Sequence, residues 1–290
     1  MGKWSSKAGI TLLAVGMLVV AASASATPSS VRKQIESSLL VTGTVDIEPD
    51  GSVSVLAIDK EDKLPESVVT FVRESGMQWR FEPVVRDGKA VRARSPMSVR
   101  VVAKKLEGNE YRITLAGASF DRYDAEDPEQ VSAIKTTPPT YPEKAWRVGA
   151  AGSAYLVVKV GLDGKVQEAV VEQVNLRVAG TEMEMRMLRG VFAKNALAAA
   201  KDWTFRPPTQ GKRAQAPFWS VRVPVSFTLQ GLPTEDSYGK WISYIPGPRQ
   251  VAPWAQDEEG AGFSPDTLAD GGVYMANGRS PRLLTPLQGG

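Results

Sequence analysis

The stretch that decides the organisation of this chain occurs twice: residues 79–83 read WRFEP and residues 203–207 read WTFRP. Three further elements recur around both stretches in the same order: an Asp-Gly pair (50–51 and 163–164), a Gly-Lys pair (88–89 and 211–212) and a Val-Arg-Val triplet (99–101 and 221–223). A long ordered pattern of this kind is unlikely to arise twice by chance. We therefore interpret the chain as a duplicated unit whose copies have diverged.

The second copy shows the parts of the unit most clearly. Apolar residues alternate over 153–160, which predicts a half-buried strand, and Asp-Gly at 163–164 favours a tight turn into a returning strand over 165–174. Thr181 and Glu184 have the spacing of a capping box, and the apolar residues behind them recur every three or four positions up to Trp203. Alternation resumes over 219–229. The pattern predicts strand, strand, helix and strand.

The first copy predicts a shorter version of the same unit. Strands are expected at 44–47 and 52–58, a helix follows Pro65, and further strands are expected at 97–103 and, after a turn at Gly108-Asn109, at 111–120. Each unit has one helical stripe and one sheet face to bury. The predicted fold class is α+β, with two small β-β-α-β modules, each an antiparallel sheet with a helix packed on one face. Trp79 and Trp203 are expected to close each helix onto its sheet.

The first 26 residues have the features of an export signal. Lys3 and Lys7 precede an apolar stretch at 8–22, which is shorter than the roughly 20 residues of a spanning helix, and a small-residue site reads ASA at 24–26. We expect a signal peptide at 1–26, a mature chain that starts at Thr27, and a periplasmic protein if the source is Gram-negative. The alternative is an uncleaved leader that anchors the chain in the inner membrane, facing the periplasm.

Composition excludes several kinds of chemistry. The chain has no Cys and no His, so disulfides, thiol nucleophiles, Ser-His-Asp catalysis and His-ligated metals are impossible. The net charge of +3 comes from interspersed acids and bases, so no nucleic-acid footprint is expected. The candidate catalytic carboxylates are Asp46, Glu48, Asp59 and Glu61, and solvated positions near turns are the simpler interpretation. We expect no enzymatic activity, no cofactor and no metal.

The domain boundaries follow from these patterns. We expect an N-terminal segment at 27–40, the first module at 41–120, an acid-rich linker at 121–137, the second module at 138–230 and a tail at 231–290. The tail holds ten Gly and seven Pro, a composition typical of disordered chain. Its aromatic stretch from Trp241 to Trp254 is expected to pack extended on a module or to act as a docking segment.

The second module resembles the C-terminal domain of the TonB family over residues 138–230. The resemblance rests on PPTYPEKA at 138–145, Gly152, the Asp-Gly turn, WTFRP at 203–207 and VPVSF at 223–227. Residues 41–120 resemble the family only through the repeat. The chain departs from a TonB energy transducer because it has no long Pro-rich spacer before the second module.

The resemblance implies a protein partner rather than a substrate. Domains of this family add a short segment of an outer-membrane transporter, the TonB box, to their sheet as an extra strand. Pro224 lacks an amide donor and therefore favours an edge strand that such a segment could join. The partner-binding residues implied are Tyr141, Pro142, Arg222, Pro224, Ser226 and Thr228. For Tyr141 and Pro142 a purely structural role is the alternative. The alternative functions are a membrane-anchored transducer and a structural envelope protein, the latter favoured if the tail or the first module already covers the closing strand.

Overall fold

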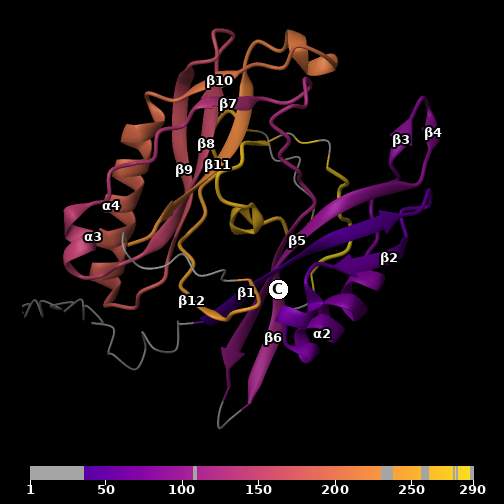
Figure 1. Cartoon of the computed structure of the whole chain (residues 1–290), viewed down its shortest axis with the longest axis horizontal. Coiled ribbons are helices and arrows are strands. Elements are labelled where there is room, and N and C mark those ends of the chain that lie inside the picture. The colour runs from indigo at the N-terminus through magenta and orange to yellow at the C-terminus, as the bar shows by residue number, and fades with distance from the viewer. Residues whose placement is uncertain are drawn as a thin grey trace, which may run out of the picture.

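The computed structural model describes residues 36–106, 110–229, 238–255, 261–276, 278 and 280–287. It has a mixed α+β architecture with mostly antiparallel sheets, and it places the two modules side by side with the C-terminal segment between them (Figure 1). The expected signal peptide and the turn at 108–109 lie outside these residues. No helix in the described part of the chain is long and apolar enough to cross a membrane.

The second module is a four-stranded antiparallel sheet covered by one long helix. Its strand order is β13-β11-β8-β9. A separate two-stranded sheet pairs β10 with β7. The elements are β7 (Ser132–Lys135), α3 (Glu143–Arg147), β8 (Gly152–Val160), β9 (Val166–Leu176), α4 (Glu182–Ala200), β10 (Thr204–Arg206), η2 (Lys212–Gln215), β11 (Trp219–Phe227) and β13 (Tyr274–Met275). The predicted capping box is confirmed, because the side chains of Thr181 and Glu184 each bond to the other's backbone amide.

The first module has the same core with more strand around it. Its sheet has the order β12-β1-β5-β6, and β2 pairs with the far end of β1. The elements are β1 (Glu36–Ile47), β2 (Val53–Ile58), η1 (Glu61–Lys63), α2 (Glu66–Met77), β3 (Val85–Arg86), β4 (Lys89–Ala90), β5 (Ala93–Lys105), β6 (Tyr111–Ser119) and β12 (Ile242–Tyr244). Strand β1 begins at Glu36, so the expected boundary at residue 41 is wrong. The sequence pattern did not predict this part of the strand because Ser37 and Ser38 are polar. Both residues belong to the strand because they pair with β5.

The two Trp-x-Phe-x-Pro stretches occupy equivalent positions. The Phe81 amide donates to the Gly51 carbonyl at 2.8 Å, and the Phe205 amide donates to the Gly164 carbonyl at 2.8 Å. Both turn glycines have positive φ, and a Cβ at either position would lie about 2 Å from the phenylalanine carbonyl oxygen. Only glycine satisfies both conditions, because it has no Cβ and tolerates positive φ. The local geometry supports the duplication inferred from sequence.

The two Val-Arg-Val triplets, at 99–101 and 221–223, do not occupy equivalent positions in the two modules. Ile47 and Val160 each lie just past a β-bulge and four residues before the turn glycine. Ile47 pairs with Ala93, and Val160 pairs with Trp219. Counting along the closing strands, the equivalent of Val99 is therefore Val225 and not Val221. The connections before these strands differ, since the first module inserts the β3–β4 hairpin where the second has η2.

Both repeat tryptophans are buried as predicted. Trp79 meets Phe120 edge-to-face with ring centroids 5.6 Å apart. Trp203 packs in the same way against Phe205, and its indole Nε1 donates to the Thr137 carbonyl at 2.9 Å. Thr137 belongs to the stretch that was expected to be a linker. Because β7 in that stretch also pairs with β10, residues 131–137 are part of the second module.

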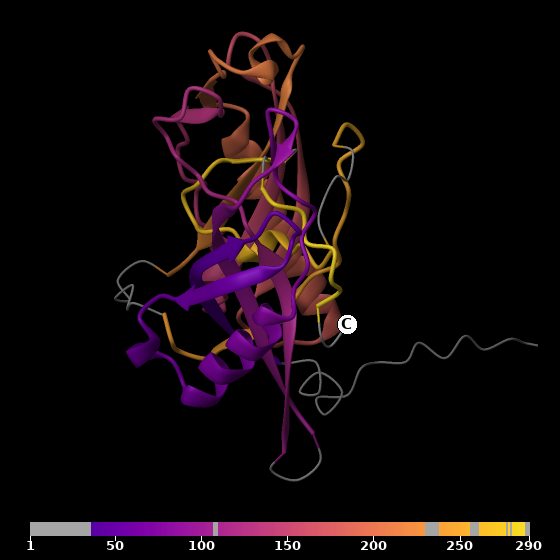
Figure 2. The ribbon, with the colours of Figure 1, turned by 90° about the vertical axis from the view of Figure 1, so that its right-hand side faces the viewer.

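The C-terminal tail, residues 238–287 where described, is not disordered as its composition predicted. It contributes a short strand or a single bridging residue to five places: β12 beside β1, Ile245 beside Leu176 of β9, Gly262 beside Ala118 of β6, β13 beside β11, and Leu283 beside Phe81. Figure 2 shows this yellow segment lying against both the indigo and the orange parts of the chain. Unpaired strand edges expose hydrogen-bonding groups, and the tail covers part of each of these edges.

One buried carboxylate fixes the tail between the modules. Asp266 in η3 (Pro265–Thr267) is 1% exposed. Its carboxylate accepts hydrogen bonds from Tyr244 and from Asn175 of β9, and its carbonyl accepts one from Arg100 of β5. A buried charge needs such partners to offset its lost hydration. Asp266 therefore links the tail to both modules at one point.

Candidate functional site

The outer edge of β11, where strand addition was expected, is occupied by the tail along residues 220–222. Val221 pairs with Met275 and Arg222 with Tyr274 in β13, and the Ala276 amide donates to the Ser220 carbonyl at 2.8 Å. In the first module the corresponding edge of β5 is covered by the nine-residue strand β6. The prediction that β11 ends the sheet is therefore wrong. The tail provides the next strand, a contact between distant residues that no local pattern signals.

Three of the predicted binding residues on β11 are committed to contacts within the chain. Arg222 is 5% exposed, and its Nε donates to Glu172 at 2.8 Å while its guanidinium lies 4.6 Å from the Phe263 ring centre. The Ser226 hydroxyl donates to Asp270, and Pro224 is buried. Thr228, just past the strand, is exposed. A guest strand can reach Arg222, Pro224 or Ser226 only after the tail leaves.

Tyr141 and Pro142 occupy structural positions. The Tyr141 ring meets Phe192 and Phe227 edge-to-face, with centroids 6.2 Å and 6.1 Å away, and its hydroxyl donates to the Ala150 carbonyl. Burial raises the pKa of the Tyr141 hydroxyl. Pro142 is buried and precedes the first turn of α3. These contacts match the alternative interpretation, in which Tyr141 packs against the sheet and Pro142 fixes the turn.

The opposite edge of the same sheet, along β9, is open over part of its length. The backbone carbonyl of Ser220 points toward β13. Successive residues of an antiparallel strand direct their backbone amides and carbonyls to opposite sides, so those of Val221 and Val223 point toward β8, where the two residues pair with Val158 and Leu156. Those two residues of β8 therefore direct their backbone groups away from β9. Their partners in β9, Ala169 and Val171, in turn direct amides and carbonyls away from β8. Within the described residues, no strand pairs with positions 166–171 on that side.

The remaining part of the β9 edge already carries an added segment. Leu176 and Ile245 exchange two backbone hydrogen bonds of 3.0 Å, and the Gln250 amide donates to the Glu172 carbonyl at 2.7 Å. Arg189 of α4 reaches over this junction and donates to the carbonyls of Val174, Ile245 and Pro246. The tail then leaves the edge and packs Ala252 and Trp254 against the face of the sheet opposite α4. Within the described residues, the tail forms no backbone pair with residues 166–171.

A groove of about 390 Å³ runs beside the open edge, between β9 and α4. Its floor includes Ala169, Val171 and Val174, which pack against the core of the module, and its wall on α4 includes Ala193 and Leu197. Side chains in a strand alternate between the two faces of its sheet. Every second side chain of a strand added to β9 would therefore enter this groove. Sequence reasoning missed the site, since β9 alternates like any half-buried strand.

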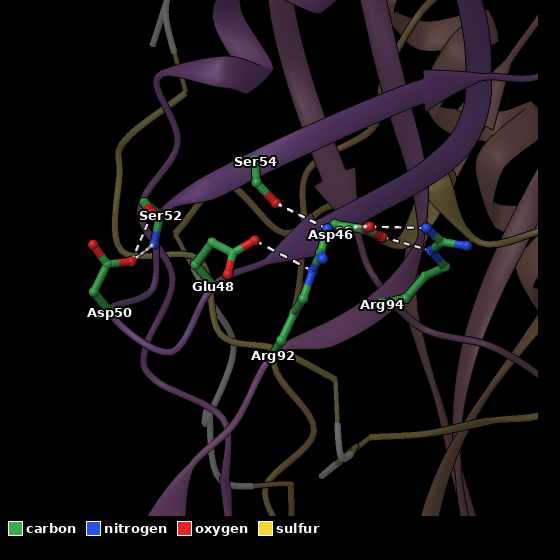
Figure 3. A network of polar contacts seen from close by, with 7 residues as sticks. All are labelled: Asp46, Glu48, Asp50, Ser52, Ser54, Arg92 and Arg94. Atoms are coloured by element: carbon green, nitrogen blue, oxygen red, sulfur yellow. Dashed lines mark hydrogen bonds and ion pairs between the residues drawn. The ribbon is translucent and has the colours of Figure 1, made fainter.

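Three of the four candidate catalytic carboxylates, Asp46, Glu48 and Glu61, form ion pairs, and Asp59 accepts a hydrogen bond from the Thr42 hydroxyl. Asp46 on β1 accepts two hydrogen bonds from Arg94, its direct partner on β5, and a third from Arg92, which also pairs with Glu48 at 3.2 Å (Figure 3). The Arg94 guanidinium holds the pKa of Asp46 below its ordinary value of 3.8. The prediction of a solvated acid is wrong for Asp46, which is buried. Its arrangement is typical of a structural cross-strand pair.

The other buried carboxylates have basic partners as well. Glu172 pairs with Arg222, and Asp266 lies 3.8 Å from Arg100. Among the residues that the structure places, no group of three acidic side chains could hold a metal ion. These carboxylates serve to join strands and tail.

Comparison with protein-family models, curated proteins and solved structures found no match to this chain. The resemblance of residues 138–230 to the TonB C-terminal domain stays a prediction based on the quoted motifs.

Proposed function

We propose that this chain is a binding protein that takes up an extended segment of another protein as an added strand on β9. The observation that supports this most strongly is the tail itself. Residues 245–250 lie along one half of the β9 edge and bond to it, while no described residue pairs with the outer side of residues 166–171, which lie beside an apolar groove. An edge that accepts one strand presents the same groups to the next.

Strand addition is favourable because the guest provides hydrogen-bond partners for backbone groups that the open edge leaves unpaired. Six open residues span about 20 Å at roughly 3.4 Å per residue, enough for a guest of similar length. Main-chain hydrogen bonds would supply affinity for any extended peptide, and the groove would select the side chains that point into it. Strand addition was proposed from sequence for β11. The structure favours β9, because no described part of the tail pairs with residues 166–171 there, whereas β13 pairs with β11.

The compartment and the partner are part of the proposal. An export signal at 1–26 puts the protein in the periplasm, and the resemblance to the TonB family suggests the TonB box of an outer-membrane transporter as the partner segment. Sequencing the N-terminus of the mature protein tests the first point. A chain that starts at Thr27 excludes the anchored energy transducer, whereas an intact leader favours it.

A structural envelope role is a second candidate, and one observation favours it. The tail pairs β13 with part of the β11 edge, as expected of a protein whose strand edges are used internally. The open half of β9 is the feature that separates the two candidates. A structural protein has no need of a guest there.

The test is a selection of random ten-residue peptides displayed on phage against the full chain. Ala169→Pro removes an amide that faces outward and should weaken selected peptides by at least about tenfold, the equivalent of one lost backbone bond. Ala169→Ser is the matched control, because it keeps the amide and nearly the same volume. Circular dichroism verifies that both variants fold.

The outcomes separate clearly. Peptides that bind the parent chain and the serine variant but not the proline variant support strand addition on β9. Peptides that bind all three proteins equally place the site elsewhere, and a selection without enrichment removes the proposal.

A further inference from the structure

The wall of the groove on α4 carries an unusual charge arrangement. Arg186, Gly190, Ala193, Leu197 and Lys201 recur at steps of three or four, which places them in one stripe of the helix. Gly190, Ala193 and Leu197 line the groove, so the stripe is small and apolar in the middle. Arg186 and Lys201 are exposed at its two ends. A strand lying on β9 would therefore run along an apolar channel with a cation near each end.

The groove itself contains positive charge without a compensating acid. Arg189 is the one charged residue that lines it among the residues described, and its hydrogen bonds go to backbone carbonyls rather than to a carboxylate. Burial lowers the pKa of the Arg189 guanidinium. A cation in this position is stabilised by an anion that reaches it.

The exposed cations of the same helix surface also have no acidic partner. No carboxylate in the described part of the chain forms an ion pair with Arg186, Lys194 or Lys201. Acidic side chains do occur near the N-terminal end of α4, where a hollow is lined by Glu36, Glu182, Lys104, Arg186 and Arg189. Glu36 pairs there with Lys104 at 3.6 Å. Glu182 is then the acid that remains beside Arg186 and Arg189 in this hollow, so the positive charge there exceeds the negative charge.

The sheet face opposite α4 offers a different surface. There Glu168 is paired with Lys159 at 2.8 Å, and Val170 packs with Trp254. Beside the open residues this face carries a neutral ion pair and apolar packing, whereas further along β9 Glu172 faces two arginines, Arg222 and Arg249. Next to residues 166–171, the cations that have no acidic partner among the described residues therefore lie on α4.

We infer that the segment bound on β9 is acidic, with small apolar side chains entering the groove and carboxylates near its ends reaching the cations of α4. This inference rests on the proposed strand addition and specifies the partner for it. Opposite charges at the rim of an interface steer the encounter and reject partners of the wrong sign. A basic segment would meet Arg186, Arg189, Lys194 and Lys201 and bind weakly.

The test uses three synthetic ten-residue peptides in which Val alternates with Glu, with Gln or with Lys. Each is titrated against the full chain by fluorescence anisotropy at low and at physiological salt. The Glu peptide should bind about tenfold more tightly than the Gln peptide at low salt, as expected for two or three rim pairs, and the advantage should shrink as salt is raised. The Lys peptide should bind most weakly.

Charge reversal of the helix identifies the cations responsible. The double variant Arg186→Glu with Lys201→Glu should lose most of the advantage of the Glu peptide and leave binding of the Gln peptide unchanged. The matched control is Lys89→Glu, an exposed lysine on β4 of the first module. It changes net charge without touching the groove, so it should retain the preference.

Two failures can be told apart. If the Gln peptide binds as tightly as the Glu peptide and Ala169→Pro abolishes both, strand addition stands and the acidic preference is wrong. If no peptide binds, or if Ala169→Pro changes nothing, both the preference and the proposed function are wrong.

Discussion

Replacing Glu172 by alanine should be among the most destabilising single changes in the second module. Glu172 lies at the bulge of β9 and joins three parts of the chain. Its carboxylate accepts hydrogen bonds from Arg222 of β11 and from Arg249 of the tail, and its carbonyl accepts the Gln250 amide. The carboxylate is 2% exposed and the Arg222 side chain 6%.

The expected cost follows from this burial. Glu172→Ala leaves a guanidinium in the interior without its carboxylate, and breaking a buried pair in this way typically costs about 3–5 kcal/mol. A whole domain is stable by roughly 5–15 kcal/mol, so the variant should be close to unfolding. Replacing both partners, as in Glu172→Leu with Arg222→Met, should restore most of the loss because the two most buried charges are then both absent and Arg249, whose side chain is 32% exposed, can reach water.

Urea unfolding followed by tryptophan fluorescence measures the effect. Glu168→Ala is the matched control on the same strand: Glu168 pairs with Lys159 but its side chain is 53% exposed, and such pairs contribute about 1 kcal/mol or less. If Glu172→Ala unfolds within 1 kcal/mol of this control, the buried pair does not hold β9, β11 and the tail together, and the reasoning fails.

Three further changes test the packing. Trp203→Ala should cost about 3–5 kcal/mol in urea unfolding, and a near-normal midpoint would contradict the burial of its indole. Tyr141→Ala should cost about 2–3 kcal/mol by the same measurement, since it removes two ring contacts and a hydrogen bond, and unchanged stability would instead favour the binding role predicted from sequence. The carboxylate of Asp46 has a lowered pKa, so its stabilisation is present above pH 3.8 and is lost as the pH falls through the folded-state value. In Asp46→Asn, the free energy of unfolding should therefore fall less steeply as the pH is lowered than it does in the parent protein. An equally steep fall in both proteins would contradict this.

The parts of the fold that sequence predicts well are those fixed by local chemistry. The turn glycines, the capping box of α4 and the buried repeat tryptophans are each signalled by a few neighbouring residues. The hairpin of each module follows from alternation on both sides of an Asp-Gly pair. A repeated pattern adds weight, since two copies must satisfy the same geometry.

The tail could not be predicted in this way. Tyr274 and Met275 form only two residues of strand, and Leu283 is a single bridge, so no periodicity marks them. Their burial is decided by edges that are distant in sequence. Gly and Pro, which suggested disorder, instead let the chain turn between successive edges of two sheets.

The same limit applies to the candidate site. Pro224 suggested an edge strand because proline has no amide hydrogen to donate, yet the neighbouring part of β11 pairs with residues about 50 positions later. The open edge of β9 is visible only when the path of residues 245–250 is known. Which edge of a sheet stays free is a property of the whole fold.

Amide hydrogen exchange tests the strand-addition proposal most directly. The full chain is compared alone and with the peptide most enriched in the selection. We predict that the outward-facing amides of Ala169 and Val171 exchange freely in the unbound protein and become protected on binding, while protection of β11 and of Tyr274 and Met275 does not change. Protection that appears on β11 as the tail loses its own would instead place the guest at the edge now filled by β13, and would contradict the site proposed on β9.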